Sequence, residues 1–482
     1  MLNNYRKEAT LFMERIIHLT KAFLEKIFTE HAYNVTDLDA TASALKKDSD
    51  QLSREILQVL IEEMNTSLRK DKSKRKELGL VIKEKDRPRN LLTELGEIKF
   101  SRDYYYNKNT EEYETPLDAM MSIERRARIG GAVSAKLSTK ATVESYERTT
   151  QDVTGGLVSR QTVLNHIHKT PELEKEPKDS EKRKVEILDV YADEDHVHLQ
   201  KPGKEKGKKS KVVPLVTVTE GKVKVGKTRY ATVNPMHFVD EKQDTDALWE
   251  SVEGYIMKTY DMEHLKEIRL HGDGAKWINK GLGNFPNVVR VLDGFHLQEY
   301  LKGISRKFPK QHVQRRINEA LAEDNRDKVE AILRSLISLC KDEKEFEKIQ
   351  DVQTYLFSNW EAAVNRFKEG ISGSCTEGLI SHVLSERFSR NPMGWSEKGV
   401  GKLSKLRVFC KNGGKIEAKH FRQSHSGSES YREYASRCVS DFVKGCDLSW
   451  INDMRDSYVF DTTSGTQQLI KKIGRCRSDI FC

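Results

Sequence analysis

The chain has 482 residues, more than one hydrophobic core usually serves, so we expect roughly two to four domains. Hydrophobic residues make up 37% and charged residues 33%, which excludes an intrinsically disordered chain. The 83 basic and 74 acidic residues leave a net charge of +9, which favours a polyanionic partner over a simple acidic enzyme surface. The N-terminus lacks the apolar core of a signal peptide and no later stretch is long enough to span a bilayer. We therefore expect a cytoplasmic protein without membrane contact.

The first part of the chain reads as helices followed by strands. Apolar residues recur every three or four positions over residues 1–70, which predicts two helices in a helical region spanning residues 1–90. The segment Leu91–Asn107 changes to alternating apolar and polar residues and ends in three tyrosines. This pattern predicts a β-hairpin that closes at Tyr113.

From Pro116 the pattern is helical again, and proline suits the start of a helix. A helix is predicted over Ala141–Val153, ended by Gly155 and Gly156, and Ser159 can cap the helix that follows. Two helices joined by a glycine turn are typical of a helix-turn-helix, although an ordinary helical hairpin fits the same pattern. We therefore predict a hairpin and a helix-turn-helix-like DNA-binding region over residues 91–170, with Arg160 among the DNA contacts.

The next segment, residues 171–184, contains two prolines and little apolar character, so it is predicted to be a linker. An α/β domain is predicted over residues 185–400. Its expected strands cover residues 185–199, 211–219, 228–234, 268–273 and 287–293, with a helix over 244–260. Residues 300–370 are helical in pattern and rich in charge, so we expect an all-α insertion there, followed by a basic C-terminal region over 401–482.

Acidic residues lie in or at the ends of the predicted strands. Asp193 and Asp195 share one face of the first strand, and a carboxylate in a core strand is costly unless a cation or another partner compensates it. Asp273 and Asp293 each end a strand, at the edge of an α/β sheet where ligands usually bind. The glycines beside Asp273 would let a ligand approach the backbone.

A late helix carries two more acids. Glu377 and Glu386 lie on opposite edges of the apolar face of the helix that begins near Thr376. Hydrolysis of a phosphodiester can use two Mg²⁺ ions about 4 Å apart, which carboxylate oxygens hold well. Taken one at a time, these acids are better explained as turn caps or solvated positions, and only their joint pattern favours a metal site.

Four blocks resemble a known family: Tyr191–Gln200, Leu270–Ile278, Val291–Leu301 and Cys375–Ser396. They are similar to the signature blocks of the ISLre family of bacterial insertion-sequence transposases, which overlaps a group of uncharacterised bacterial proteins. The likeness covers most of the chain, including the segment around Ile98 and the one after Pro116. It departs at Ser389–Arg390–Asn391–Pro392, where many relatives have arginine directly before the proline.

The resemblance implies a ribonuclease H-like catalytic domain with an Asp-Asp-Glu triad and a helical insertion before the last acid. It assigns catalysis and metal binding to Asp193, Asp273 and Glu377, with two Mg²⁺ or Mn²⁺ ions. Asp293 and His296 match a neighbouring block, and we expect His296 to support the site or contact DNA. Asp195 is an alternative ligand if a bulge shifts the strand, and Glu386 is an alternative third acid.

Basic segments suggest where DNA would bind. The run from Lys201 to Lys211 holds six lysines, and we expect Lys204, Lys206, Lys208 and Lys209 to contact phosphates, although a solvated hairpin tip is equally compatible. Residues 398–423 hold eight Lys or Arg residues against one Glu, and there Lys402, Lys405 and Arg407 are the candidates.

The sequence therefore predicts a transposase that binds double-stranded DNA, both the terminal inverted repeats of its element and the target, as a homo-oligomer. An inactive or domesticated DNA-binding relative is the first alternative. A glycoside hydrolase using paired carboxylates is the second.

Overall fold

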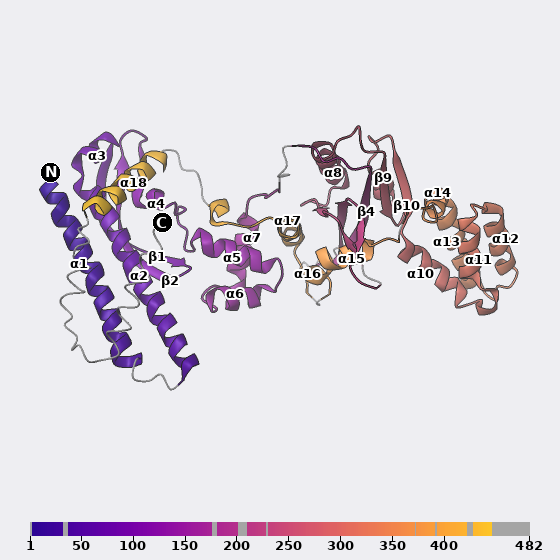
Figure 1. The fold of residues 1–482 in the computed structure, drawn as a ribbon, viewed down its shortest axis with the longest axis horizontal. Helices are drawn as coiled ribbons and strands as arrows, with labels where there is room; N and C mark the ends of the chain where they lie inside the picture. The colour runs from indigo at the N-terminus through magenta and orange to yellow at the C-terminus, as the bar shows by residue number, and fades with distance from the viewer. Residues whose placement is uncertain are drawn as a thin grey trace. The chain divides into compact units, whose positions relative to one another are not determined.

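The computed structural model describes residues 2–31, 37–175, 181–200, 210–227, 230–371, 373–390, 393–421 and 428–445. The chain forms two compact units, one of Met1–Gly130 with Arg422–Cys482 and one of Gly131–Phe421, both traced in Figure 1. These boundaries differ from the predicted ones because the hairpin packs on the N-terminal helices, whereas the helix-turn-helix-like segment belongs to the second unit. No helix of the described ranges is both long and apolar enough to cross a membrane.

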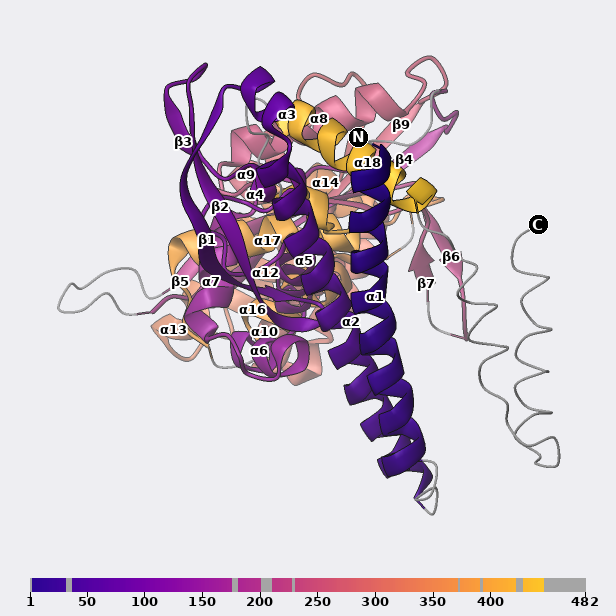
Figure 2. The same ribbon diagram turned by 90° about the vertical axis from the view of Figure 1, so that its left-hand side faces the viewer.

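Long helices form the frame of the first unit. Helix α1 (Leu2–Lys26) continues into the π-helical turn η1 (Ile27–His31) and runs beside α2 (Leu38–Lys70), as Figure 2 shows. The second predicted helix is confirmed, but its buried apolar positions are Val59, Ile61 and Leu68, whereas Leu60 of the predicted stripe is 41% exposed. Three shorter or later helices complete it: α3 (Lys72–Glu77), α4 (Pro116–Met120) and α18 (Ser428–Gly445).

The sheet of the first unit has three antiparallel strands in the order β1-β2-β3. They are β1 (Leu80–Thr93), β2 (Gly96–Asn107) and β3 (Glu112–Glu114). The strand predicted at Leu91–Asn107 is therefore two strands joined by a tight turn, and the hairpin predicted to close at Tyr113 is formed by β2 and β3. The first part of β1 was not predicted because it contains Pro88 and several charges. An edge strand tolerates both, since one side of its backbone needs no partner strand.

The second unit begins with three helices, α5 (Gly131–Ala141), α6 (Tyr146–Thr154) and α7 (Arg160–Lys169). Helix α6 starts later than predicted because Ser145 is its N-cap and accepts a hydrogen bond from the Arg148 amide. Gly155 ends α6 in the left-handed conformation at φ 60°, as the glycine pair predicted. Ser159 caps α7 in the predicted way.

A mixed five-stranded sheet follows, in the order β10-β9-β4-β5-β8. Strand β5 is antiparallel to both of its neighbours, β4 and β8, while β4, β9 and β10 are parallel. Helix α8 (Thr245–Thr259) packs on one face, where its buried residues form a common core with Leu188, Val190 and Ala192. The strands are β4 (Ile187–His198), β5 (Ser210–Thr219), β8 (Met236–Phe238), β9 (Glu267–Gly272) and β10 (Val288–Leu292).

The third strand of this sheet differs from the predicted one. The segment expected at residues 228–234 forms β7 (Tyr230–Thr232), which pairs with β6 (Lys222–Lys224) in a separate ribbon. The sheet instead takes β8, whose His237 is buried and bonded to Thr217 of β5. The alternation that marks a strand does not tell which partner the strand pairs with.

The predicted helical stretch after the last strand is confirmed. Its helices share a single apolar core that includes Leu297, Leu321 and Leu356, and they lie together beyond β10 in Figure 1. Helix α14 packs directly on β10. The helices are α10 (Gly294–Ser305), α11 (Val313–Ala322), α12 (Arg326–Ile337), α13 (Glu343–Ser358) and α14 (Trp360–Asn365). The protein is thus a mixed α+β chain with a helical insertion attached to a mixed sheet.

Candidate functional site

The register between two parallel strands brings Asp193 and Asp273 to the same side of the sheet. Tyr191 of β4 pairs with His271 of β9, and their rings stack with centroids 4.6 Å apart. Asp193 and Asp273 each come two residues after this pair, and the charges of both act on His296. Asp193 is 8% exposed, and Asp273 directly follows the last residue of β9.

A histidine faces these carboxylates from the start of α10. The Nε2 atom of His296 lies 4.0 Å from Oδ2 of Asp193. The interaction with Asp193 raises the pKa of His296 to about 9; burial opposes this, and the charges of Asp293 and Asp273 add to the rise. His296 is therefore a cation at neutral pH. The three carboxylates that act on it come from β4 and from the positions directly after β9 and β10.

Asp293 has a structural task at the same edge of the sheet. It is 2% exposed, and its Oδ1 accepts hydrogen bonds from the amides of Phe295, at 2.7 Å, and His296, at 3.2 Å. This N-cap fixes the first turn of α10 and so positions His296. Asp293 thereby orients His296, the residue on which Asp193 and Asp273 also act.

The helical insertion closes over the end of β9. Gly274 has φ of 90°, and a Cβ there would come within 2.4 Å of Asn359 Oδ1. Tyr355 of α13 donates a hydrogen bond of 2.9 Å to the backbone oxygen of Asp273. At Gly272, a Cβ would approach Ile278 Cγ2 to 2.8 Å. The prediction that these glycines admit a ligand is therefore corrected: they make room for side chains of the protein.

Glu194 lies on the opposite face of β4 from Asp193, as the alternation of the strand predicted, on the side of the core shared with α8. Its Oε2 accepts a hydrogen bond of 3.1 Å from the indole of Trp277, which lies in α9 (Lys276–Asn279). Burial raises the pKa of Glu194, and the charges of Asp273 and Asp193 raise it further. The three successive acids at 193–195 were visible in the sequence, but the alternation of a strand was expected to turn the Glu194 side chain away from those of Asp193 and Asp195.

Asp195 is held by serines of the helical segment that covers this face of β4. Its carboxylate accepts hydrogen bonds from Ser389, at 2.8 Å, and Ser385, at 3.1 Å. Burial raises the pKa of Asp195, and the two serines oppose that rise. The β4–β5 register runs without a shift from Asp189 to His198, so the bulge that would have favoured Asp195 as a ligand is absent there.

Substitution of these two aspartates should give different results in a strand-cleavage assay. Asp193→Asn should lower the cleavage rate by at least ~10³-fold if Asp193 holds a metal ion as the transposase resemblance implies, because that ligand would lose its charge. Asp195→Asn should change the rate by less than ~10-fold, because an amide oxygen still accepts from the serines. Equal losses in both variants would contradict the assignment of Asp193.

The two candidate third acids differ in their surroundings. Glu377 lies in α15 (Thr376–Ile380), a helix that packs on β4, and its side chain is exposed. Glu386 begins α16 (Glu386–Phe388) and accepts from His382 at 2.9 Å and from the buried Arg407 at 3.2 Å. Those partners lower the pKa of Glu386, His382 first. Glu386 is therefore engaged in structural ion pairs, whereas Glu377 is accessible to a ligand.

The predicted DNA-contacting residues lie in different settings. Arg160 is exposed at the start of α7 and pairs with Glu147 at 3.3 Å. Lys402 pairs with Glu241, and Lys405 with Glu172 and Glu174. The structure places Arg407 in the interior, 2% exposed, where it donates to the backbone oxygens of Thr142, Val383 and His382 instead of reaching DNA. Lys204, Lys206, Lys208 and Lys209 lie outside the described residues.

The donor set around His296 fits a hard divalent cation. Carboxylate oxygens are the ligands that Mg²⁺ and Mn²⁺ prefer, and Asp193, Asp273 and Glu377 offer such oxygens. The oxygens of Asp193, Asp273 and Glu377 do not, however, form a group within 4.8 Å of one another in the described part of the chain. Closing such a group around an ion would require their side chains to move.

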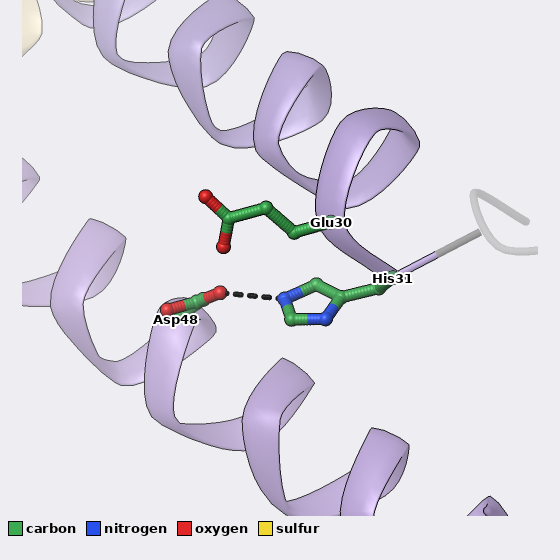
Figure 3. A group of neighbouring side chains, drawn as sticks. All are labelled: Glu30, His31 and Asp48. Atoms are coloured by element: carbon green, nitrogen blue, oxygen red, sulfur yellow. Dashed lines mark hydrogen bonds and ion pairs between the residues drawn. The ribbon is translucent and has the colours of Figure 1, made fainter. Parts of the chain in front are cut away.

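The one such group among the described residues lies elsewhere, at the end of the α1–α2 helical pair. It consists of Glu30, His31 and Asp48, drawn in Figure 3. His31 Nε2 lies 2.8 Å from Asp48 Oδ2, and Lys26 donates to Asp48 Oδ1 at 2.6 Å. Because Lys26 already supplies a positive charge, we interpret this cluster as an ion-pair network that joins α1 to α2.

Comparison with known proteins assigns the chain to a family. Residues 29–425 match the model of an uncharacterised protein family, UPF0236. The chain belongs to the UPF0236 family. Its relatives include several UPF0236 proteins of Caldanaerobacter subterraneus subsp. tengcongensis. One is 34% identical over 425 residues, 88% of each chain, and another is 35% identical over 431 residues, 89% of each chain.

The names of these UPF0236 proteins show that the family occurs in several copies in one genome. The first relative's name groups eleven loci of a single genome, and another's groups four. A more distant member, named for its position in the vanSb 3′ region of Streptococcus gallolyticus, is 26% identical over 66% of this chain and 71% of its own. Many family copies in one genome are consistent with a mobile element.

Proposed function

We propose that this UPF0236 protein is a transposase that cuts and joins DNA with two Mg²⁺ or Mn²⁺ ions. The observation that carries the proposal is geometric: Asp193, Asp273 and Asp293 stand in or directly after the adjacent parallel strands β4, β9 and β10, and His296 lies 4.0 Å from Asp193. The multicopy relatives support the mobile-element part of the proposal.

The fold agrees with what the transposase resemblance implies. Three antiparallel strands, a helix and two parallel strands, with β4 in the centre, are the arrangement expected of a ribonuclease H-like domain. The helical insertion separates the first two acids from Glu377 in the implied order. Fold alone does not establish activity, so the acids carry the argument.

The chemistry requires oxygen ligands on neighbouring elements. Asp193, Asp273 and Glu377 would hold the ions, which would activate the attacking oxygen and stabilise the leaving oxygen of a phosphodiester. The Asp293 cap positions His296 at the same edge of the sheet. The positively charged imidazole of His296 would contact a DNA phosphate. Bringing two element ends together calls for more than one copy of the chain, so we propose a homo-oligomer on DNA.

The test is cleavage of DNA carrying the ends of the element, with Mg²⁺ or Mn²⁺ and with a chelator. Cleavage should require the metal. Glu377→Gln should lower the rate by at least ~10³-fold. The matched variant Glu386→Gln should change the rate by less than ~10-fold and should instead lower stability by about 1–3 kcal/mol, because Arg407 loses its charged partner.

Three outcomes would contradict this proposal in different ways. Cleavage that persists in the chelator would remove the metal mechanism. Specific binding of element ends without any cleavage would favour an inactive DNA-binding relative. Loss of cleavage in the Glu386 variant alone would move the third acid from Glu377 to Glu386.

A further inference from the structure

The second unit contains an open pocket away from the acidic group. Its volume is about 660 Å³, within the range of small-ligand sites. The starts of three helices line it: Ser145 and Tyr146 of α6, Ser159 and Arg160 of α7, and Ser396 before α17 (Glu397–Lys411). All of these residues belong to the same compact unit.

Each of the three helices begins with the same kind of cap. Ser145 Oγ accepts from the Arg148 amide at 3.2 Å, Ser159 Oγ from Thr162 at 3.2 Å, and Ser396 Oγ from Gly399 at 3.1 Å. A capping serine satisfies one of the four amides that a helix start leaves open. The remaining amides and the partial positive charge of the helix start favour an anion. Three such ends therefore face one pocket.

A buried arginine supplies the independent sign of a ligand. Arg387 lines the pocket and is only 2% exposed. Its Nε donates to the Ala141 oxygen at 2.8 Å, but its Nη1 is buried and has no hydrogen-bond partner in the described residues. A buried guanidinium donor without a partner is costly, and the positive charge of this guanidinium at the pocket wall favours an anion in the pocket.

Aromatic rings surround the same arginine. Its guanidinium lies 4.6 Å from the ring centre of Trp395 and 5.6 Å from that of Tyr146. The hydroxyl of Tyr146 is also buried without a partner in the part of the chain that is described. Among the lining residues, the acid is Glu147, which is already paired with Arg160. Phosphate-attracting helix ends beside aromatic rings are the combination that proteins use for unpaired nucleotides.

We propose that this pocket binds an unpaired nucleotide of a DNA strand, with its phosphate at the three helix starts and Arg387 and its base beside Tyr146. The choice of DNA as the ligand rests on the proposed transposase function, whereas the phosphate site rests on the pocket alone. The pocket would then hold a strand end or a base displaced from the duplex.

The test is the binding of a 12-nucleotide oligothymidylate to the full chain and to two charge variants of α7. Gln161→Glu places a carboxylate in the first turn of α7, where it favours the helix but repels a phosphate in the pocket. Asn165→Asp makes the same charge change one turn away, at an exposed residue that accepts a hydrogen bond from Gln161. At about 50 mM salt, Gln161→Glu should weaken binding about fivefold to tenfold and Asn165→Asp less than about twofold. A blunt duplex of equal length should respond equally to both.

Several results would overturn the pocket as a nucleotide site. These are a wild-type protein that does not bind the oligothymidylate, equal effects of the two variants, or a duplex as sensitive to Gln161→Glu as the single strand. The proposed function fails separately: oligothymidylate binding that is sensitive to Gln161→Glu, without any cleavage of element ends, would support the pocket and remove the transposase assignment.

Discussion

Asp273→Asn should abolish strand cleavage, lowering its rate by at least ~10³-fold, while leaving the binding of element ends within about twofold. The amide keeps the local turn, because Asp273 Oδ1 accepts from the Ala275 amide at 2.9 Å and an amide oxygen can do the same. What the variant loses is the negative charge beside Asp193. Cleavage is measured on labelled element ends, and binding by gel shift in the presence of Ca²⁺.

The matched control for this variant is Asp261→Asn in the same unit. Asp261 also accepts from the amide two residues ahead, that of Glu263 at 3.0 Å, but it lies in the turn between α8 and the start of β9. The control should cleave at the wild-type rate. A fully active Asp273→Asn variant, or a control that is equally impaired, would remove Asp273 from the chemistry.

Asp103→Ala should destabilise the first unit by about 3–5 kcal/mol, the usual effect of breaking a buried ion pair. Asp103 is completely buried in β2. It accepts from Arg69 Nε at 2.7 Å, from Arg69 Nη2 at 2.6 Å and from the Asp86 amide at 3.0 Å. Its loss leaves a charged guanidinium without its main partner. Hydrogen exchange of peptides from β1 and β2 at increasing urea concentration measures the effect within this unit.

Asp86→Asn is the control, since Asp86 pairs with the same Arg69 but its side chain is 60% exposed, and asparagine tolerates the positive φ of 56° at this position. An exposed pair contributes about 0–1 kcal/mol, so this variant should be nearly as stable as the wild type. Similar losses in both variants would mean that Arg69, and not the burial of Asp103, decides the stability of the unit.

The same aspartate predicts how the first unit responds to acid. Burial acts to raise the pKa of Asp103, but Arg69 and the Asp86 amide outweigh it and hold this pKa below its usual value. A carboxyl whose folded pKa is depressed stabilises the fold above its unfolded pKa, and that contribution is lost as pH falls through the folded pKa. The stability of wild-type protein should therefore decrease below about pH 4, and that decrease should be smaller in Asp103→Ala.

Much of the local structure could be predicted because its causes are close in sequence. Ser159 caps α7 and Gly155 ends α6 through contacts within a few residues. The apolar runs before Asp273 and Asp293 predicted buried strands that end in acids, and β9 and β10 are those strands. The charged first part of β1 was not predicted from such a pattern, because it forms a strand by pairing with β2 and not through an apolar pattern of its own side chains.

Basic residues illustrate what sequence patterns leave open. Arg407 lies in a run of positive charge and was predicted to contact DNA, yet it is buried and donates to three backbone oxygens. No role was predicted for Arg387, yet it lines a pocket, and one of its guanidinium nitrogens has no hydrogen-bond partner in the described residues. Charge alone does not distinguish these cases, since the partners come from segments up to about 265 residues away.

By itself, the sequence determined the helices, most strands, the helical insertion and the acids that end or occupy the strands. These follow from apolar spacing, caps and turn residues, which act between near neighbours in the chain. Only the tertiary structure decided that Tyr191 aligns with His271, which sets Asp193 beside Asp273, and that Tyr355 and Asn359 close over the end of β9. The register of parallel strands and the docking of the insertion depend on packing between distant segments, which no local pattern encodes.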